Sequence, residues 1–387
     1  TSGAARNPSD LEFILTDIPV HVQGRIEVGD DVIAFTELVG SVRQVNYVVP
    51  SAGDTAGRGL PDNAQWDPNS FLVTGKKIVL LGGPTNDFVF TISIYDTETD
   101  AIVSIPKDDI RLEVIPVSNY APAFMVADGN YVATMNKIGF DGVADNMRLR
   151  VIDVSGDDPV VIPFAHNPSG SDIANIDQIM VDAETHTLVA QVQQVFYVYD
   201  ILNPDDAPIE FDTTPYGGVE QFDAQHTLED GMLLYYDNTA QGGFRYWDIM
   251  DPQSEPVTIE KERLGGGRTA MIDDFYVLLA NGKAIVDSLP ETNPVETDPQ
   301  TQDGRGVTIA IGFIGATPYA IIGSQDNANT MQFSAGGGAW TTVADPRSPN
   351  DDLEVGDVHT DTLGQFLGFK HEISGDYFLG YAVLDSQ

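Results

Sequence analysis

The chain has 387 residues, 42% of them hydrophobic, which is enough for a large folded core and excludes a disordered chain. Its 19 Lys and Arg residues stand against 59 Asp and Glu residues, and the formal net charge is −40. Such a charge repels nucleic acid and anionic membrane surfaces, so we expect neither as a partner. Cysteine is absent, which excludes disulfides, thiolate zinc sites and cysteine nucleophiles.

The first ten residues, Thr1–Asp10, are small and polar, like the spacer that follows a processed leader. We expect a flexible spacer at 1–10 and a single domain at 11–387. Since the sequence opens on Thr1 and not on Met, we expect a mature exported protein, located in the periplasm, on the cell surface or outside the cell. The acidic surface is typical of a protein that must stay soluble in salty water.

A short strand, ending in Asp in its clearest copies, recurs about every 48 residues along the chain. The copies end at Val49, Asp96, Asp153, Asp200, Asp248, Asp287, Ser334 and Asp385. Around them lie short β-rich runs separated by Gly, Asp and Pro turns, and no stretch of a dozen residues shows helical periodicity. A four-stranded blade of a β-propeller takes about 40–50 residues. The repeat therefore predicts an all-β propeller of eight blades, with seven as the alternative if the copy at Phe333 is misread.

The two ends of the chain each hold an incomplete blade. The run Glu12–Leu15 is a strand without a blade of its own, whereas the unit at Phe366–Leu384 lacks an outer strand. One four-stranded sheet leaves its faces and edges open, and neighbouring blades cover them. We therefore expect the N-terminal strand to complete the C-terminal blade and close the propeller.

One uncharged stretch, Gly306–Gln325, has the length of a membrane span. It contains four glycines and a proline, and its β-branched residues alternate with other types. This pattern favours two buried strands joined by a turn at Gly315 over a membrane helix.

The stretches Ile94–Pro106 and Leu149–Pro163 share one pattern: a strand ending in Asp, a turn rich in polar residues and an outer strand. This pattern resembles the repeats of YncE-like and LVIVD-type propeller proteins, over about five of the eight units. The resemblance implies a propeller fold and often export, but no activity, because the signature is structural. The Asp at each strand end is expected to cap the amides of the following turn.

Signatures of catalysis are missing from the sequence. It contains no nucleophile elbow, no phosphate-binding glycine loop with Lys and no His-Glu-x-x-His motif, so we favour a protein that is not an enzyme. Among six scattered histidines, His226 is the candidate ligand, because acidic residues flank it where a blade begins. Ca²⁺ is the one cofactor that the sequence leaves open. Asp141, Asp145 and Asp326 lie in loops with oxygen ligands, and solvated acidic loops are the alternative.

Ligands of propellers usually bind at the mouth of the central channel, where loops lead into the inner strands. Arg58, Arg263, Arg268 and Arg305 fall in or next to such predicted loops. A guanidinium suits a carboxylate or sulfate, and glycines beside Arg268 and Arg305 permit close approach. The alternative is that each Arg pairs with a neighbouring acid. Trp66 is a candidate platform for a sugar, with packing between blades as the alternative.

The leading functional hypothesis is a non-enzymatic, exported binding or assembly module that engages a protein partner or an anionic carbohydrate at the channel-mouth loops. One alternative is a lyase or hydrolase for an acidic carbohydrate or lactone at the central channel, with Ca²⁺ as its cofactor. A pocket in which His, Arg and carboxylates converge would favour this enzyme. Another alternative is a structural subunit of an extracellular assembly, whose association would depend on salt or divalent ions because the chains repel one another.

Overall fold

A computed structural model describes the larger part of the chain. It covers residues 11–62, 65–82, 89–105, 112–113, 125–135, 149–166, 168, 176–219, 226–237, 243–259, 268–280, 283–289, 295–297, 307–324 and 329–384. The regular structure of these residues is strand, with short 3-10 turns such as Pro50–Ala52 and Thr214–Tyr216, and they contain no α-helix. No helix in this part of the chain is long and apolar enough to cross a membrane.

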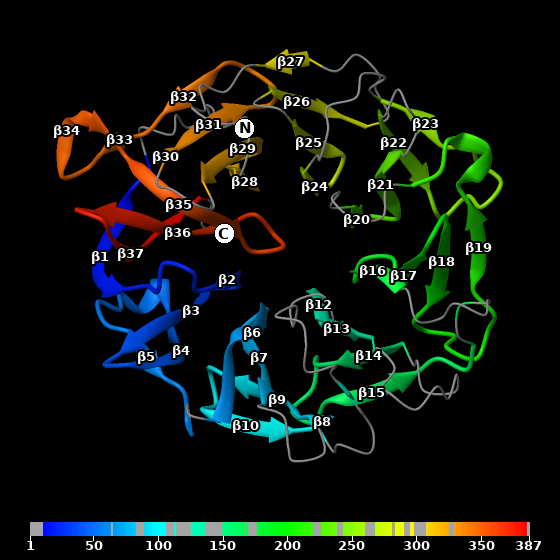
Figure 1. Cartoon of the computed structure of the whole chain (residues 1–387), viewed down its shortest axis with the longest axis horizontal. Coiled ribbons are helices and arrows are strands. Elements are labelled where there is room, and N and C mark those ends of the chain that lie inside the picture. Colours follow the sequence, from blue (N-terminus) through cyan, green and yellow to red (C-terminus); the bar gives the residue numbers. More distant parts are fainter. Residues whose placement is uncertain are drawn as a thin grey trace. The chain divides into compact units, whose positions relative to one another are not determined.

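Eight antiparallel sheets form the blades (Figure 1); seven of them have four strands, and the sheet of the last blade has five. This confirms the prediction of an all-β, eight-bladed β-propeller, and the seven-bladed alternative is wrong. Four blades belong to each of two compact units, one formed by 64–263 and the other by 1–63 together with 264–387.

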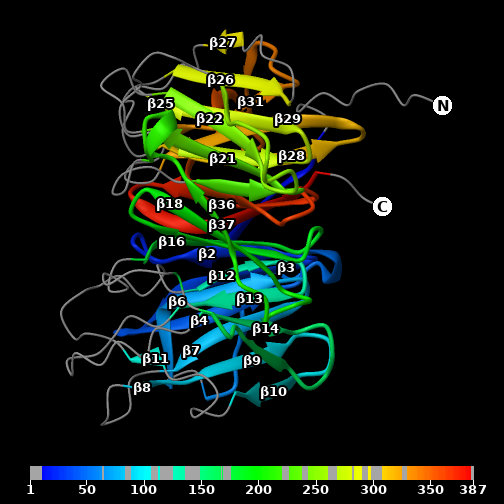
Figure 2. The ribbon, with the colours of Figure 1, turned by 90° about the vertical axis from the view of Figure 1, so that its right-hand side faces the viewer.

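The first unit, 64–263, contains blades 2 to 5. In the side view, the strands of blade 2 follow one another from the inner to the outer strand (Figure 2). Blade 2 consists of β6 (Trp66–Thr74), β7 (Lys77–Gly82), β9 (Ile92–Asp96) and β10 (Ala101–Ser104), and blade 3 of β12 (Met125–Asp128), β13 (Tyr131–Thr134), β14 (Arg150–Asp153) and β15 (Val160–Pro163). Blade 4 consists of β16 (Ile176–Asp182), β17 (Thr187–Val192), β18 (Val195–Asp200) and β19 (Ile209–Asp212), and blade 5 of β20 (Thr227–Glu229), β21 (Met232–Asp237), β22 (Gly243–Asp248) and β23 (Val257–Thr258). A small separate sheet pairs β8 (Val89–Phe90) with β11 (Leu112–Glu113).

The other unit contains blade 1 and blades 6 to 8. Blade 1 consists of β2 (Ile26–Gly29), β3 (Val32–Val39), β4 (Val42–Val48) and β5 (Arg58–Gly59), and blade 6 of β24 (Arg268–Ile272), β25 (Phe275–Ala280), β26 (Lys283–Ser288) and β27 (Val295–Thr297). Blade 7 consists of β28 (Val307–Ile314), β29 (Thr317–Ser324), β31 (Gln332–Ala335) and β32 (Trp340–Thr342), and blade 8 of β35 (Glu354–Thr360), β36 (Phe366–Ile373), β37 (Asp376–Val383) and β1 (Phe13–Pro19). The uncharged stretch forms β28 and β29, joined at Gly315, whose φ is +65°. The prediction of two strands and a turn is confirmed.

The sequence repeat marks the third strand of every blade. These strands are β4, β9, β14, β18, β22, β26, β31 and β37. The terminal Asp caps the next turn as predicted: Asp96 Oδ1 accepts a hydrogen bond from the amide of Glu98 at 2.8 Å, and Asp153 Oδ1 accepts one from the amide of Ser155 at 2.9 Å. A short side chain that satisfies turn amides ends the strand and starts the reversal.

Blade 8 is completed by the N-terminal strand, as predicted. In β1, Phe13 and Leu15 lie opposite Ala382 and Gly380 of β37, so the first strand forms the outer edge of the last blade. The Phe13 ring packs edge-on against Phe333, with ring centroids 6.3 Å apart. This pairing removes an open edge from the last blade.

The strands of blade 8 are buried on both faces. On one face, Phe369 and Leu367 pack with the side chains of blade 7, and on the other Leu379 and Tyr381 pack with those of blade 1. Packing is tight enough that a Cβ added to Gly380 would lie 2.2 Å from the Phe369 ring, so only glycine fits there. Burial on both faces explains why these strands are apolar throughout instead of alternating.

Candidate functional site

The connection between blades 7 and 8 carries a hairpin of its own. Its strands β33 (Ala344–Asp345) and β34 (Ser348–Asp352) form a two-stranded sheet outside the blades. A second addition, β30 (Asn329–Thr330), lies between β29 and β31 in sequence but pairs with β35, the inner strand of blade 8. Both additions depart from the repeat at the start of β35, and additions to a regular scaffold are where function is usually located.

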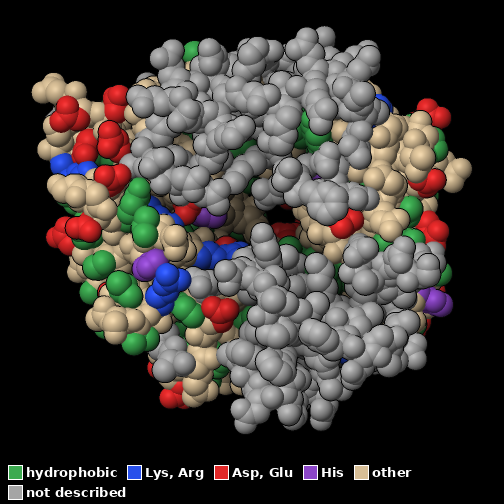
Figure 3. Space-filling model, in the orientation of Figure 1, with side chains coloured by type: hydrophobic (Ala, Val, Ile, Leu, Met, Phe, Trp, Pro, Cys, Tyr) green, Lys and Arg blue, Asp and Glu red, His purple; other side chains and the backbone are tan. Residues whose placement is uncertain are grey.

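These additions and the neighbouring strands of blade 8 border an open cavity of about 470 Å³, which we call the hairpin pocket. It is lined by Thr330, Asp345, Arg347, Asn350, Asp351, Asp352, Glu354 and Glu372. Five of these side chains are carboxylates and one is a guanidinium. In Figure 3, acidic side chains, drawn red, gather over β33 and β34 beside a blue cation. The pocket is therefore strongly acidic.

The one cation of the hairpin pocket is already compensated. Arg347 Nε donates to Asp345 Oδ1 at 3.0 Å, and Arg347 Nη2 donates to Asp345 Oδ2 at 2.7 Å, which makes a bidentate pair. These hydrogen bonds hold the pKa of Asp345 below its usual value. The carboxylates of Asp351, Asp352 and Glu354 make no ion pair with any described residue, and the same holds for Glu372. The pocket thus presents four uncompensated negative charges.

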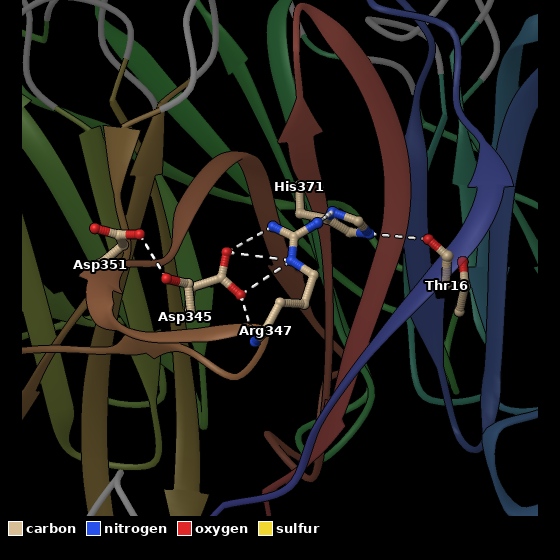
Figure 4. A network of polar contacts seen from close by, with 6 residues as sticks. Thr16, Asp345, Arg347, Asp351 and His371 are labelled. Carbon is tan, nitrogen blue, oxygen red and sulfur yellow. Dashed lines mark hydrogen bonds and ion pairs between the residues drawn. The ribbon is translucent and has the colours of Figure 1, made fainter.

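A chain of polar contacts runs from the hairpin pocket to the N-terminal strand (Figure 4). Arg347 Nη1 lies 3.4 Å from Nδ1 of the buried His371 on β36, and His371 Nε2 lies 3.0 Å from the carbonyl oxygen of Thr16 on β1. Because a carbonyl can only accept, Nε2 carries the proton and Nδ1 faces the guanidinium as an acceptor. Burial lowers the pKa of His371, which keeps the imidazole neutral near pH 7. The pocket and the closing strand therefore share one network.

A second polar group, which we call the inner-strand cluster, lies where the inner strands β2 and β35 of blades 1 and 8 approach each other. It consists of Arg25, Glu27, Asp357, His359 and Lys370. Arg25 forms an ion pair with Glu27, and Lys370 forms one with Asp357. The Lys370 ammonium is almost fully buried and also donates to the carbonyl oxygen of Gly24 at 2.7 Å. The cluster is a charge-balanced group in a strongly acidic chain.

His359 is the one group of the inner-strand cluster outside these pairs. Its pKa is lowered, mainly by burial; Glu27 and Asp357 oppose that change, while Arg25 and Lys370 add to it. The imidazole makes no hydrogen bond with any residue that the structure describes. A neutral imidazole can accept a proton, and Glu27 and Asp357 would favour the imidazolium that forms, whereas Arg25 and Lys370 would oppose it.

Three candidate residues from the sequence lie in the described part of the chain. Arg58 lies on the outer strand β5 and pairs with Asp54, Nε to Oδ2 2.7 Å. Trp66 begins the inner strand β6, half-buried opposite Gly82. His226 is buried just before β20, where its ring packs edge-on against Phe196, with centroids 5.9 Å apart. The three residues belong to three different blades: Arg58 to blade 1, Trp66 to blade 2 and His226 to the start of blade 5.

The remaining candidates cannot be placed. Arg263, Arg305, Asp141, Asp145 and Asp326 lie outside the described residues, and only the main chain of Arg268 is described, in β24. Within the described ranges, no group of three His, Asp or Glu side chains is arranged to hold a metal ion. The anion-binding rim and the Ca²⁺ site therefore stay predictions.

Sequence reasoning missed both polar groups. A signal for the hairpin pocket was present in the stretch from Asp345 to Glu354, which combines four acidic residues with two prolines between the last strand of blade 7 and the first of blade 8. The inner-strand cluster has no local signal, because its members come from opposite ends of the chain.

Comparisons with known proteins show the fold alone. No protein-family model matches the chain, and no curated protein matches it either. Among solved structures, the WD40 repeats of RRP9 match with 11% identity and a TM-score of 0.53, over 97% of this chain and 100% of that one. BamB from Moraxella catarrhalis matches with 13% identity and a TM-score of 0.50, over 96% and 98%. A prolyl endopeptidase matches with 9% identity and a TM-score of 0.52, over 90% of this chain and 54% of its own. These likenesses agree with the β-propeller architecture.

Proposed function

We propose that this chain is a non-enzymatic, exported binding or assembly module that docks a basic element of a protein partner in the hairpin pocket. The propeller fold and its likeness to the WD40 repeats of RRP9 support a binding role. Absent catalytic signatures and the lack of cysteine agree with an exported binder. We also propose that the repeat belongs with the YncE-like or LVIVD-type propellers, on the strength of Ile94–Pro106 and Leu149–Pro163.

The observation that carries this proposal is the set of uncompensated carboxylates in the hairpin pocket. Asp351, Asp352, Glu354 and Glu372 face one cavity, and the only guanidinium there is held by Asp345. A Lys or Arg side chain of a partner would find several acceptors at once, whereas an anionic group would be repelled. The net charge of −40 would speed the encounter with a basic partner through long-range attraction.

The test separates pocket binding from general attraction to an acidic protein. The variant Asp351→Asn/Asp352→Asn/Glu354→Gln removes three charges from the hairpin pocket, and the matched control Asp157→Asn/Asp158→Asn/Asp205→Asn removes three exposed charges elsewhere. We expect the pocket variant to bind an oligo-arginine peptide at least about tenfold more weakly, by calorimetry or fluorescence anisotropy, and the control to bind like the wild type. Equal losses in both variants would contradict the proposal.

The inner-strand cluster favours an enzyme as a second candidate. We propose that His359 would accept a proton from an acidic carbohydrate or a lactone, with Glu27 and Asp357 stabilising the imidazolium. Arg25 forms an ion pair with Glu27 through Nε, and its other guanidinium nitrogens bind no described residue. These nitrogens would bind the carboxylate of the substrate. This arrangement combines His, Arg and carboxylates in one place.

The second candidate is tested by turnover. Uronic-acid polymers and lactones are incubated with the wild type, with His359→Gln and with His166→Gln, which changes an exposed histidine outside the cluster. We expect product from the wild type and the control but not from His359→Gln. If the wild type converts none of these substrates, or His359→Gln converts them equally well, the enzyme proposal is wrong.

A further inference from the structure

The β3–β4 hairpin of blade 1 projects beyond its own sheet. On one side β2 pairs with β3 only as far as Phe35, and on the other β5 pairs only with Asn46 and Tyr47 of β4. The pairing between β3 and β4 nevertheless continues to Val39 opposite Val42. Residues 37–44, which we call the finger, therefore have no neighbouring strand among the described residues.

The tip of the finger carries three exposed apolar side chains close together in sequence. Leu38, Val39 and Val42 are 45%, 47% and 50% exposed. Such residues at the end of a projecting hairpin favour contact with another protein surface, because burial there removes apolar area from water.

Arg43 places a positive charge near the tip of the finger, whereas the hairpin pocket is negative overall; Glu37, at the base of the finger, accepts a hydrogen bond from Asn46. It lies opposite Leu38 on the finger and makes no ion pair with a described carboxylate. By contrast, six other cations pair with acids: Arg25, Arg58, Lys76, Arg245, Arg347 and Lys370. An unpaired arginine is unexpected in a chain with 59 acidic residues, and it suggests that the carboxylate partner comes from another molecule.

We propose that the finger of one copy of this chain docks in the hairpin pocket of a second copy. Arg43 would bind Asp351, Asp352 and their neighbours, while the apolar tip would cover the rim of the pocket. This inference rests on the proposed function, because it requires a pocket that accepts a basic side chain, and it names the partner of that site as the chain itself.

The topology allows both contacts to form at the same time. Glu354 begins β35 and Glu372 lies near the end of β36, so the hairpin pocket is at the end of blade 8 where its first strand starts and its second strand finishes. The finger is the end of β3, the second strand of the adjacent blade 1. Finger and pocket thus lie on the same face, and a two-fold dimer that meets through this face makes the contact twice.

Association must overcome repulsion between two chains that each carry −40. Salt shortens the range of this repulsion to about 10 Å at 0.1 M, whereas a close ion pair that excludes water is screened much less. We therefore expect dimerisation to strengthen from low to moderate ionic strength and to weaken again at high salt.

The experiment measures the oligomeric state by sedimentation velocity over a range of protein concentrations at moderate ionic strength. We expect a reversible dimer for the wild type and at least about tenfold weaker association for Arg43→Glu. The matched control is Arg58→Glu, which changes the net charge equally at an exposed arginine on the same blade. Asp351→Lys/Asp352→Lys should also weaken association, and combining it with Arg43→Glu should restore it. A wild type that stays monomeric, equal effects of Arg43→Glu and Arg58→Glu, or no restoration would each overturn the inference.

The two proposals fail in different ways. If the wild type binds oligo-arginine through the hairpin pocket but stays monomeric, the proposed function stands and the dimer is wrong. If the pocket variant and its control bind oligo-arginine equally, the proposed function fails, whatever the oligomeric state.

Discussion

His371 donates a hydrogen bond from Nε2 to the main-chain oxygen of Thr16, and these two residues belong to opposite ends of the chain. The bond is made where β1 departs from regular pairing with β37, between Leu15 and Pro19. At this irregularity the Thr16 carbonyl needs a side-chain donor, and the buried imidazole supplies it. The contact ties the closing strand to the network of the hairpin pocket.

Replacing His371 is expected to destabilise the protein. In His371→Ala the buried carbonyl of Thr16 loses its donor and a cavity forms, and an unsatisfied buried group alone costs about 1–3 kcal/mol. Chemical denaturation of the wild type and the variant measures the difference in the free energy of unfolding. The exposed His166→Ala serves as the control and should change it little. A His371→Ala protein as stable as this control would show that the bond contributes nothing.

Stability should fall on mild acidification, and His371 should account for part of the loss. Burial lowers its pKa; Arg347 acts in the same direction, while the bond to Thr16, Asp345 and Asp17 oppose the shift. The contribution of His371 to the free energy of unfolding is therefore fully present above its pKa in the unfolded chain, about 6.5. It is lost as the pH falls toward the lower pKa of His371 in the folded protein. His371→Gln keeps a donor but does not titrate, so its loss of stability should be smaller. Burial raises the pKa of Asp128 and Asp361, so their protonation stabilises the folded state as the pH falls. This effect is the same in the wild type and in His371→Gln, so the difference between their pH profiles reports on His371. Identical pH profiles would contradict this assignment.

Two lysines should differ sharply in their contribution to stability. Lys370 is almost fully buried, and Lys370→Met would leave the Asp357 carboxylate without its partner, at an expected cost of about 3–5 kcal/mol. Lys76 pairs with Glu98 at the surface, and Lys76→Met should cost less than about 1 kcal/mol. Thermal and denaturant unfolding of the two variants compare them directly. If the costs were equal, the interior of the inner-strand cluster would have to be accessible to water.

The N-terminal strand should be needed for the stability of blade 8. Phe13 packs edge-on against Phe333 and Phe369, with centroids 6.3 Å and 6.2 Å apart. Phe13→Ala removes both contacts from a partly buried position, and we expect a loss of about 2–4 kcal/mol. Glu12→Ala, next to it and exposed, is the control. Limited proteolysis gives a second measurement, because a loosened β1 should expose the edge of β37. If Phe13→Ala were as stable as the Glu12→Ala control, Phe13 would not be needed to hold β1 on blade 8.

Much of the fold could be predicted because each blade repeats one local signal. The Asp that ends β9 or β14 caps the next turn, so the sequence itself contains the reason for the strand end. The closing strand was also predictable, since the run Glu12–Leu15 had no blade of its own and the C-terminal unit lacked an outer strand.

The polar groups could not be predicted in the same way. Arg347 meets His371 only because an inserted hairpin folds back toward β36, and Glu27 meets His359 only because the first and last blades are neighbours. Tertiary packing decides such contacts, and no local pattern encodes them. Arg58, predicted as an anion ligand, pairs instead with Asp54, which lies four residues earlier in the sequence.

The closing strand also sets the order in which this protein can be made. Thr16 Oγ1 donates a hydrogen bond to the carbonyl oxygen of Leu379, 363 residues later, so a chain emerging from the ribosome keeps β1 unmatched until Leu379 has appeared. Such distant pairing is slow to form, and an unpaired strand edge invites contact with other chains. A nascent chain that terminates early would therefore lack any partner for β1, and every incomplete copy would be a target for chaperones or degradation.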